Sequence, residues 1–337
     1  MTIKDLAKKT GYAVATVSRV LNNHPNVSEK ARKAITAAVE ESGFQLNANA
    51  KQLKQQHTTT LLMVVKGTGN ELFGELVEAI QSLVAQTDYA LVVDYLDEDA
   101  NEVRRGVQLC REKKPLGILF LGGNSRNFRE DFEKIDIPCV LVTNDASELC
   151  FSNLSSVSID DRAAARQAVD ALISQGHRKF AVVGGDRTVS DTSRLRYQGC
   201  LDAFRDRHIC FDEEQDYCGI RFSCRDGYDA TRDLIARGRS FTALFAAADV
   251  MAIGAIRALW DCGLRVPQDV SVVGFDGLPL GSYLVPQLST VVQPVQIMAK
   301  RSVEILIGCI EGTGGARHET IPFELQQRES TCGAAGN

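Results

Sequence analysis

Short apolar runs alternate with polar, helix-like segments along most of the chain from Thr60 onward. A run in which successive residues are all apolar is typical of a parallel strand that is covered by helices on both faces. About ten such runs occur, which is more than one compact sheet of usual size contains, so we expect two α/β subdomains. The clearest runs are LLMVV, ALVVD, GILFLG, CVLVT, SVSID, KFAVVGG, ALFAAAD and VSVVGFD.

The first 46 residues show a different pattern, in which apolar positions recur at helical spacing. A first short helix should end at Gly11, because the turn there requires a positive φ. A second helix is expected over about 14–21. A third should begin after Ser28, which can cap it, and close at Gly43. Three short helices predict a small all-α bundle that contains a helix–turn–helix.

Charge separates this helical head from the rest of the chain. The 337 residues carry a formal net charge of -5. Residues 1–57 hold nine Lys or Arg and four Asp or Glu, a net charge of +5, whereas the remainder carries -10. Such asymmetry indicates an anionic partner for the head alone.

Targeting signals and cysteines restrict the class of protein further. No apolar run approaches the ~20 residues that span a bilayer, and the first residues lack the apolar core of a secretion signal, so we expect a cytoplasmic protein without membrane contact. The ten cysteines form no C-x-x-C pair, and we expect reduced, mostly buried thiols. A metal or redox sensor built on Cys210, Cys218 and Cys224 is the alternative.

The second helix carries side chains that suit the major groove of DNA. A recognition helix presents small or polar residues at its N-terminal end. Arg19 can pair with guanine O6 and N7, while Thr16 and Ser18 suit phosphate or base contacts. Val14 and Ala15 offer apolar contact, for example to a thymine methyl group. The alternative is a small helical domain that binds another protein.

Several sequence segments, spread over almost the whole chain, resemble those of one known family. ATVSRVLNN, followed by VSEKARKAI, closely resembles the head of the LacI family of bacterial transcription regulators, and NANAKQLK resembles its hinge. QGHRKFAVVGG, ADVMAIGAIRAL, VPQDVSVVGFD and PQLSTVVQP resemble successive landmarks of its effector-binding core. The resemblance implies a core similar to periplasmic sugar-binding proteins, with two doubly wound parallel-sheet subdomains and a ligand between them.

The resemblance also implies how the chain is divided. A DNA-binding head would cover 1–46, a hinge 47–58, an effector-binding and dimerisation core 59–333, and a tail 334–337. Within the core, one subdomain would hold about 59–158 plus 291–318, and the other about 159–290 plus 319–333.

The hinge would fold on the operator, where its residues would contact the minor groove. Leu53 would insert as an apolar wedge that bends the DNA, although it could also be an ordinary linker leucine. Two departures from the family stand out: Tyr12-Ala13 replaces a usual Val-Ser and removes the N-cap hydroxyl of the recognition helix, at a cost of ~0.5–2 kcal/mol, and Leu46 replaces a usual Pro. The expected hinge contacts are Asn47, Ala50, Lys51 and Leu53.

Ligands of open parallel sheets bind beyond the carboxyl ends of the strands, where several candidate effector contacts fall. By resemblance, Arg196 and Asp276 would bind hydroxyl or anionic groups, Phe222 would stack on an apolar face, and Phe73 would wall the cleft. Asp160 and Asp249 could instead cap helices, and Phe222 could be plain core. Ala248 stands where many relatives have Asn, which puts a standard hexose pose in doubt. The full set is Asn70, Leu72, Phe73, Asp160, Thr192, Arg196, Phe222, Asp249, Asp276 and Gln293.

The resemblance makes a sugar or sugar phosphate the default effector, with a nucleobase or a partner phosphoprotein as alternatives. It also implies a repressor that acts as a homodimer on a near-palindromic operator. KGTGNELFG matches neither a dinucleotide fingerprint nor a P-loop, and the chain has no nucleophile elbow or zinc-ligand helix. We therefore expect no enzyme, no cofactor and no metal; a sugar-binding or enzymatic α/β protein without a DNA role is the remote alternative.

Overall fold

The computed structural model describes residues 3–21, 27–42, 59–67 and 69–334. The chain divides into two units, Met1–Gln56 and His57–Asn337, which are described separately below. The expected boundary between head and hinge, at residues 46 and 47, lies outside the described residues. The hinge residues Asn47, Ala50, Lys51 and Leu53 lie outside the described residues, so their contacts with DNA stay predictions.

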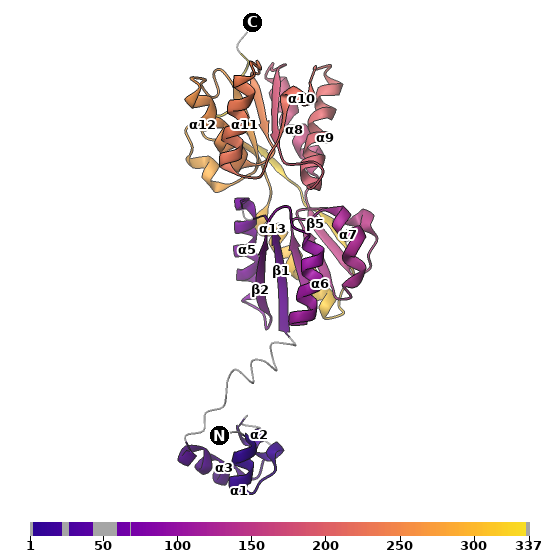
Figure 1. The fold of residues 1–337 in the computed structure, drawn as a ribbon, viewed down its shortest axis with the longest axis vertical. Coiled ribbons are helices and arrows are strands. Elements are labelled where there is room, and N and C mark those ends of the chain that lie inside the picture. The colour runs from indigo at the N-terminus through magenta and orange to yellow at the C-terminus, as the bar shows by residue number, and fades with distance from the viewer. Residues whose placement is uncertain (1–2, 22–26, 43–58, 68, 335–337) are drawn as a thin grey trace. The chain divides into compact units, whose positions relative to one another are not determined.

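Within its described residues, the head forms three helices (Figure 1). They surround a small apolar core. Leu6, Val17 and Ile35 are fully buried, one from each helix. Gly11 has the expected positive φ of 72°, and the Ser28 hydroxyl accepts the N–H of Ala31 at 3.4 Å, as expected of a helix cap. The helices are α1 (Ile3–Thr10), α2 (Val14–Leu21) and α3 (Glu29–Ser42).

The first lobe of the core is a parallel six-stranded sheet in the order β11-β5-β4-β3-β1-β2. Leu61 and Met63 of β1 pack with α5 (Glu71–Val84) and α13 (Val295–Ile310), whereas Leu62 and Val64 pack with α6 (Glu102–Lys113) and α7 (Ser125–Asp131). Strand alternation therefore explains why both faces need helices. The strands are β1 (Thr60–Lys66), β2 (Ala90–Leu96), β3 (Gly117–Leu121), β4 (Cys139–Val142), β5 (Leu154–Ser158) and β11 (His318–Thr320), and the short turns η1 (Phe132–Lys134) and η2 (Ser147–Leu149) join them.

The second lobe repeats this plan in the order β12-β10-β9-β8-β6-β7, with β12 antiparallel at one edge. One helix pair is α8 (Asp161–Ser174) with α9 (Asp191–Asp206), and the other is α11 (Cys224–Ala236) with α12 (Asp249–Asp261). The remaining elements are β6 (Phe180–Gly184), β7 (Tyr217–Gly219), β8 (Ala243–Ala246), β9 (Ser271–Asp276), β10 (Ser289–Val292), β12 (Glu324–Gln326), α10 (Glu213–Asp216) and η3 (Pro279–Tyr283). The two-lobed α/β fold expected from the apolar runs is confirmed.

The chain crosses between the lobes three times, so that α13, late in the sequence, lies with the first lobe (Figure 1). The crossings follow β5, β10 and β11. Because β10 continues to Val292 and β11 to Thr320, the second and third crossings come two residues later than the boundaries expected at 290/291 and 318/319.

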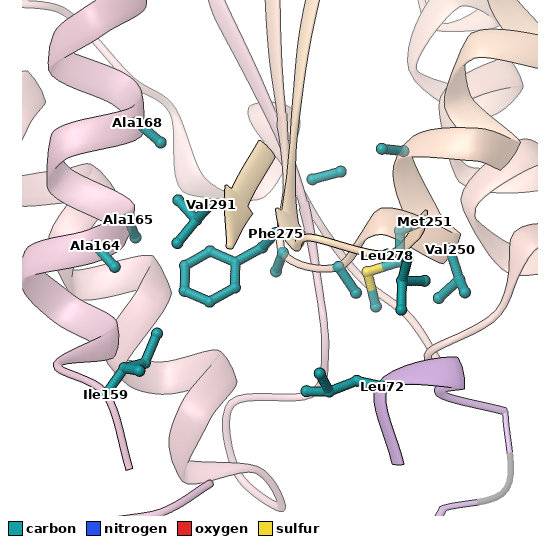
Figure 2. Close-up of a cluster of buried hydrophobic side chains, with 14 of the residues drawn as sticks. Leu72, Ile159, Ala164, Ala165, Ala168, Val250, Met251, Phe275, Leu278 and Val291 are labelled. Atoms are coloured by element: carbon teal, nitrogen blue, oxygen red, sulfur yellow. The ribbon is translucent and has the colours of Figure 1, made fainter. Parts of the chain in front are cut away.

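Phe275 of β9 packs in the interior of the second lobe, near the cleft. Its ring points toward α8, where Ala164, Ala165 and Ala168 leave room for it (Figure 2). Small side chains on a helix let an aromatic ring and the sheet approach closely. Phe275 thereby becomes a rigid platform beneath the site described below.

The cysteine prediction is wrong in one respect. All ten are free, but only Cys139 and Cys200 are buried, and Cys150, Cys210, Cys224 and Cys262 are exposed. The described residues contain no group of three or more His, Cys, Asp or Glu that could hold a metal ion. No helix in the described part of the chain is both long enough and apolar enough to cross a membrane.

Candidate functional site: a recognition helix and an interlobe cleft

The outer face of α2 presents the side chains that were predicted to meet DNA. Val17 is buried, whereas Val14 is 45% exposed and Ala15 and Arg19 are also exposed. Thr16 is half-buried, and the side chain of Ser18 is outside the described set. The helix begins on backbone contacts, because the carbonyl of Ala13 accepts the N–H groups of Thr16 and Val17 at 2.8 and 3.1 Å.

A cavity of about 290 Å³ lies between the two lobes, where the loops that follow their strands converge. This is near the lower end of the size range of small-molecule sites. Six of the ten predicted effector contacts line it: Asn70, Leu72, Phe73, Thr192, Arg196 and Phe222.

Two aromatic rings from different lobes line the cavity, Phe73 and Phe222. Each lies against a glycine that a larger residue could not replace. A Cβ on Gly122, whose φ is 72°, would come within 2.9 Å of the Phe73 ring, and a Cβ on Gly185 would come within 2.6 Å of the Phe222 ring. Rings held in this way can pack on the apolar face of a small ligand.

Arg196 forms part of the cavity wall while it is held by protein groups on its other side. Its Nε donates to Asp161 Oδ1 at 2.7 Å, and Nη1 donates to the carbonyl of Ala247 at 2.6 Å. The guanidinium lies 3.7 Å from the ring centroid of Phe275. Arg196 is only 3% exposed, so its position is fixed before any ligand binds.

Asp276 and Gln293 lie behind Arg196 and are not among the residues that line the cavity, so their direct contact with an effector stays a prediction. Asp276 Oδ1 accepts from Gln293 Nε2 at 2.9 Å and lies 3.5 Å from Arg196 Nη1. Asp276 Oδ2 and Gln293 Oε1 are buried and have no hydrogen-bond partner within the described structure. Burial raises the pKa of Asp276 to about 6, although Arg196 and Gln293 oppose the shift. Two buried acceptors without donors are costly to the folded protein.

The other two predicted aspartates, Asp160 and Asp249, do not line the cavity either, and their side chains have partners within the protein. Asp160 is exposed and caps α8, where its Oδ1 accepts the N–H of Ala163 at 2.9 Å. Asp249 Oδ2 accepts the N–H groups of Gly277 and Leu278 at 2.9 and 2.7 Å. Asp160 therefore has the structural role considered as an alternative, while Asp249 anchors the turn after β9 instead of capping a helix.

Several residues that line the cavity were not predicted from the sequence. Nearly all follow strands β1, β2, β3, β4, β6 or β7, so applying the strand-end rule to every predicted strand could have found most of them. They are Lys66, Gly67, Glu98, Asp99, Gly122, Gly123, Thr143, Asn144, Asp186, Val189, Ser190, Gly219, Ile220 and Arg221.

Hydrogen bonds and ion pairs join the lobes beside the cavity. Asn124 Nδ2 donates to the carbonyl of Val189 at 3.0 Å, and the N–H of Ser125 donates to Asp191 Oδ2 at 2.6 Å. We call these contacts the α7–α9 clasp. At the cavity rim, Arg221 of the second lobe forms ion pairs with three carboxylates of the first, Asp97, Glu98 and Asp99.

Comparisons with known proteins agree with this architecture. A model of bacterial regulatory proteins of the lacI family matches residues 2–47, and a model of the periplasmic binding protein-like domain matches residues 169–331. The regulator MalR of Clostridium butyricum is 34% identical over 98% of this chain and 99% of its own. The chain belongs to the LacI family of bacterial regulatory proteins.

Solved structures place this LacI-family chain with DNA-binding regulators in three dimensions as well. A Lac repressor dimer bound to operator and an anti-inducer has a TM-score of 0.79 at 25% identity, and it covers 98% of this chain and 99% of its own. A complex of the regulator CelR with cellobiose has a TM-score of 0.71 at 26% identity, with the same coverage. The protein is a DNA-binding transcriptional regulator and not an enzyme, as predicted.

Proposed function

We propose that this regulator represses carbohydrate-utilisation genes in the cytoplasm and that a sugar effector binds in the interlobe cavity. The observation that carries the proposal is the cavity itself, where Phe73 and Phe222 from opposite lobes accompany polar side chains. Sugars present both apolar faces and hydroxyl groups, so they match such a lining. A relative named ribose operon repressor and the CelR neighbour bound to cellobiose support a sugar over a nucleobase or a partner phosphoprotein.

The effector would act by changing how the lobes lie relative to each other. A ligand that touches both Phe73 and Phe222 favours one arrangement of the lobes, because contacts are lost if the lobes move apart. Two chains in a homodimer would pass this change to two heads on a near-palindromic operator. The Lac repressor dimer on its operator supports this assembly.

Selection of DNA fragments by the full-length protein tests the DNA-binding half of the proposal. The selected sequences should be near-palindromic, and binding should weaken with salt at a log–log slope of about -0.9 for each phosphate contact. Arg19→Ala should lose preference at one base pair of each half-site, at a cost of ~1–3 kcal/mol, because Arg19 is exposed on α2.

Lys33→Ala is the matched control, since Lys33 is an exposed cation of α3 in the same head. It should lower affinity evenly across sequences without changing preference. Identical sequence preferences for the Arg19→Ala variant and the wild type would remove α2 from the role of recognition helix.

A further inference from the structure

Carboxylates neutralise each cation that lines the cavity in the described structure. Lys66 is the first of three. Its Nζ lies 2.7 Å from Glu102 Oε2, and the two side chains are 7% and 0% exposed. Glu102 is held in turn, because its Oε1 accepts the N–H of Asn124 at 2.8 Å and its Oε2 accepts from Asn127 Nδ2 at 2.9 Å. The positive charge of Lys66 is therefore matched by a buried carboxylate with a fixed position.

The two arginines of the cavity are paired in the same way. Arg196 lies between the buried carboxylates of Asp161 and Asp276, at 2.7 and 3.5 Å. Burial raises the pKa of each of these aspartates, although Arg196 opposes the shift. Arg221 faces the Asp97–Asp99 segment, in which each of three carboxylates forms an ion pair with its guanidinium at 2.7 to 3.2 Å.

Carboxylates thus outnumber cations around the cavity. Six carboxylates pair with the three cations, and Asp186 adds another to the lining. A phosphate group brings a charge of about -1.5 to -2 at neutral pH and three further acceptor oxygens. It would meet like charges and compete for cations that already have partners, which is unfavourable.

Hydroxyl groups, in contrast to a phosphate, suit this site, because its lining is rich in hydrogen-bond acceptors. The lining itself holds carboxylate, amide and hydroxyl oxygens, from Glu98, Asp99, Asp186, Asn70, Asn144 and Thr192. A neutral polyol supplies donors without adding charge. We propose that the cleft selects an uncharged, hydroxyl-rich effector and excludes its phosphate ester, an inference that rests on the proposed sugar-responsive function.

Thermal unfolding and calorimetry of the full-length protein test this selection. The probes are maltose, cellobiose and glucose, compared with glucose 6-phosphate and inorganic phosphate at matched ionic strength. At least one neutral sugar should raise the unfolding midpoint, while both phosphates leave it unchanged. Glucose 6-phosphate should bind at least about tenfold more weakly than glucose.

The variant D97N/E98Q/D99N tests whether these three carboxylates are the cause of the phosphate exclusion. It leaves the Arg221 guanidinium at the cavity rim without its carboxylates, and these exposed or half-exposed positions should tolerate the change. The ratio of glucose to glucose 6-phosphate affinity should shift at least about tenfold toward the phosphate, or inorganic phosphate should begin to stabilise the protein. Taking a ratio removes any common effect on lobe closure.

E133Q/D136N/E148Q is the matched control, because it removes three exposed carboxylates of the first lobe that do not line the cavity. It should behave like the wild type. A wild-type protein that binds phosphate esters as tightly as the parent sugars would overturn the inference, and so would a D97N/E98Q/D99N variant that still excludes phosphate. If no sugar binds and the variant nevertheless gains phosphate binding, the sugar proposal fails while the charge selection stands.

Discussion

At the scale of single residues, Asp249 and Asp276 show how similar sequence positions acquire different roles. Both are aspartates next to buried strands of the second lobe, and sequence reasoning placed both in the ligand site. Asp249 is enclosed by the backbone N–H groups of Gly277 and Leu278 and by the Thr290 hydroxyl at 2.6 Å. Burial, together with the nearby charge of Asp276, raises the pKa of Asp249 to about 8. The difference depends on partners 28 to 41 residues away, which no local pattern predicts.

This environment predicts a pH dependence of stability. In the unfolded chain Asp249 ionises near its ordinary pKa of 3.8, whereas the folded protein keeps the proton up to about pH 8. Between these values the folded state binds more protons, so the free energy of unfolding falls as pH rises. Asp249→Asn cannot ionise, yet its amide can accept from Gly277 and donate to Thr290. Urea unfolding between pH 5 and 8 should show a smaller decline for the variant; parallel curves would contradict the assignment.

At the scale of elements, the α7–α9 clasp joins the lobes through the start of two helices. The N–H of Ser125, in the first turn of α7, has no partner within its own helix and meets the Asp191 carboxylate of α9 instead. Asn124 both caps α7 and reaches the carbonyl of Val189. These contacts exist only while the lobes hold this arrangement, so they favour the form that encloses the cavity.

Removing the clasp should weaken effector binding without unfolding either lobe. A hydrogen bond to a charged group contributes about 1.5–3 kcal/mol, so Asp191→Ala should raise the Kd of the effector roughly tenfold or more. Asp206→Ala is the control, because it removes an ion pair with Arg166 that lies within the second lobe. Calorimetry with the sugar that binds best measures the Kd of each variant. Equal affinities for both variants would show that the clasp does not stabilise the ligand-binding form.

The helices and strands also show which parts of the fold can be predicted from the sequence. Eight apolar runs correspond to strands, and all of these strands except the edge strand β2 are buried along their whole length. Strands β7 and β11 were not expected from such runs, because each has three residues, lies at the edge of a sheet and is partly exposed. The same limit applies to the site: Arg196 and the two phenylalanines follow from the family pattern, whereas the charge pairing of Lys66 with Glu102 spans 36 residues and appears only in three dimensions.

At the scale of the whole molecule, the chain has two separate units with opposite electrostatic character. The basic head holds α2, the proposed recognition helix, and the acidic core holds a cavity that both lobes line. Control of DNA binding by an effector requires these units to be coupled. A regulator that binds ligand and DNA independently cannot change its operator affinity when the ligand binds. Coupling is reciprocal: the factor by which a ligand changes operator affinity equals the factor by which operator changes ligand affinity.

The most direct test is a titration of the selected operator with full-length protein, with and without a saturating amount of the sugar that binds best. Saturating sugar should change operator affinity by roughly 5- to 150-fold, and saturating operator should change sugar affinity by the same factor. Phe222→Ala, which removes one cavity wall, should abolish sugar binding and the change while leaving the operator affinity of the ligand-free protein unaltered. Operator affinity that ignores the sugar, or a sugar response that survives in the Phe222→Ala variant, would contradict the claim that the cleft controls DNA binding.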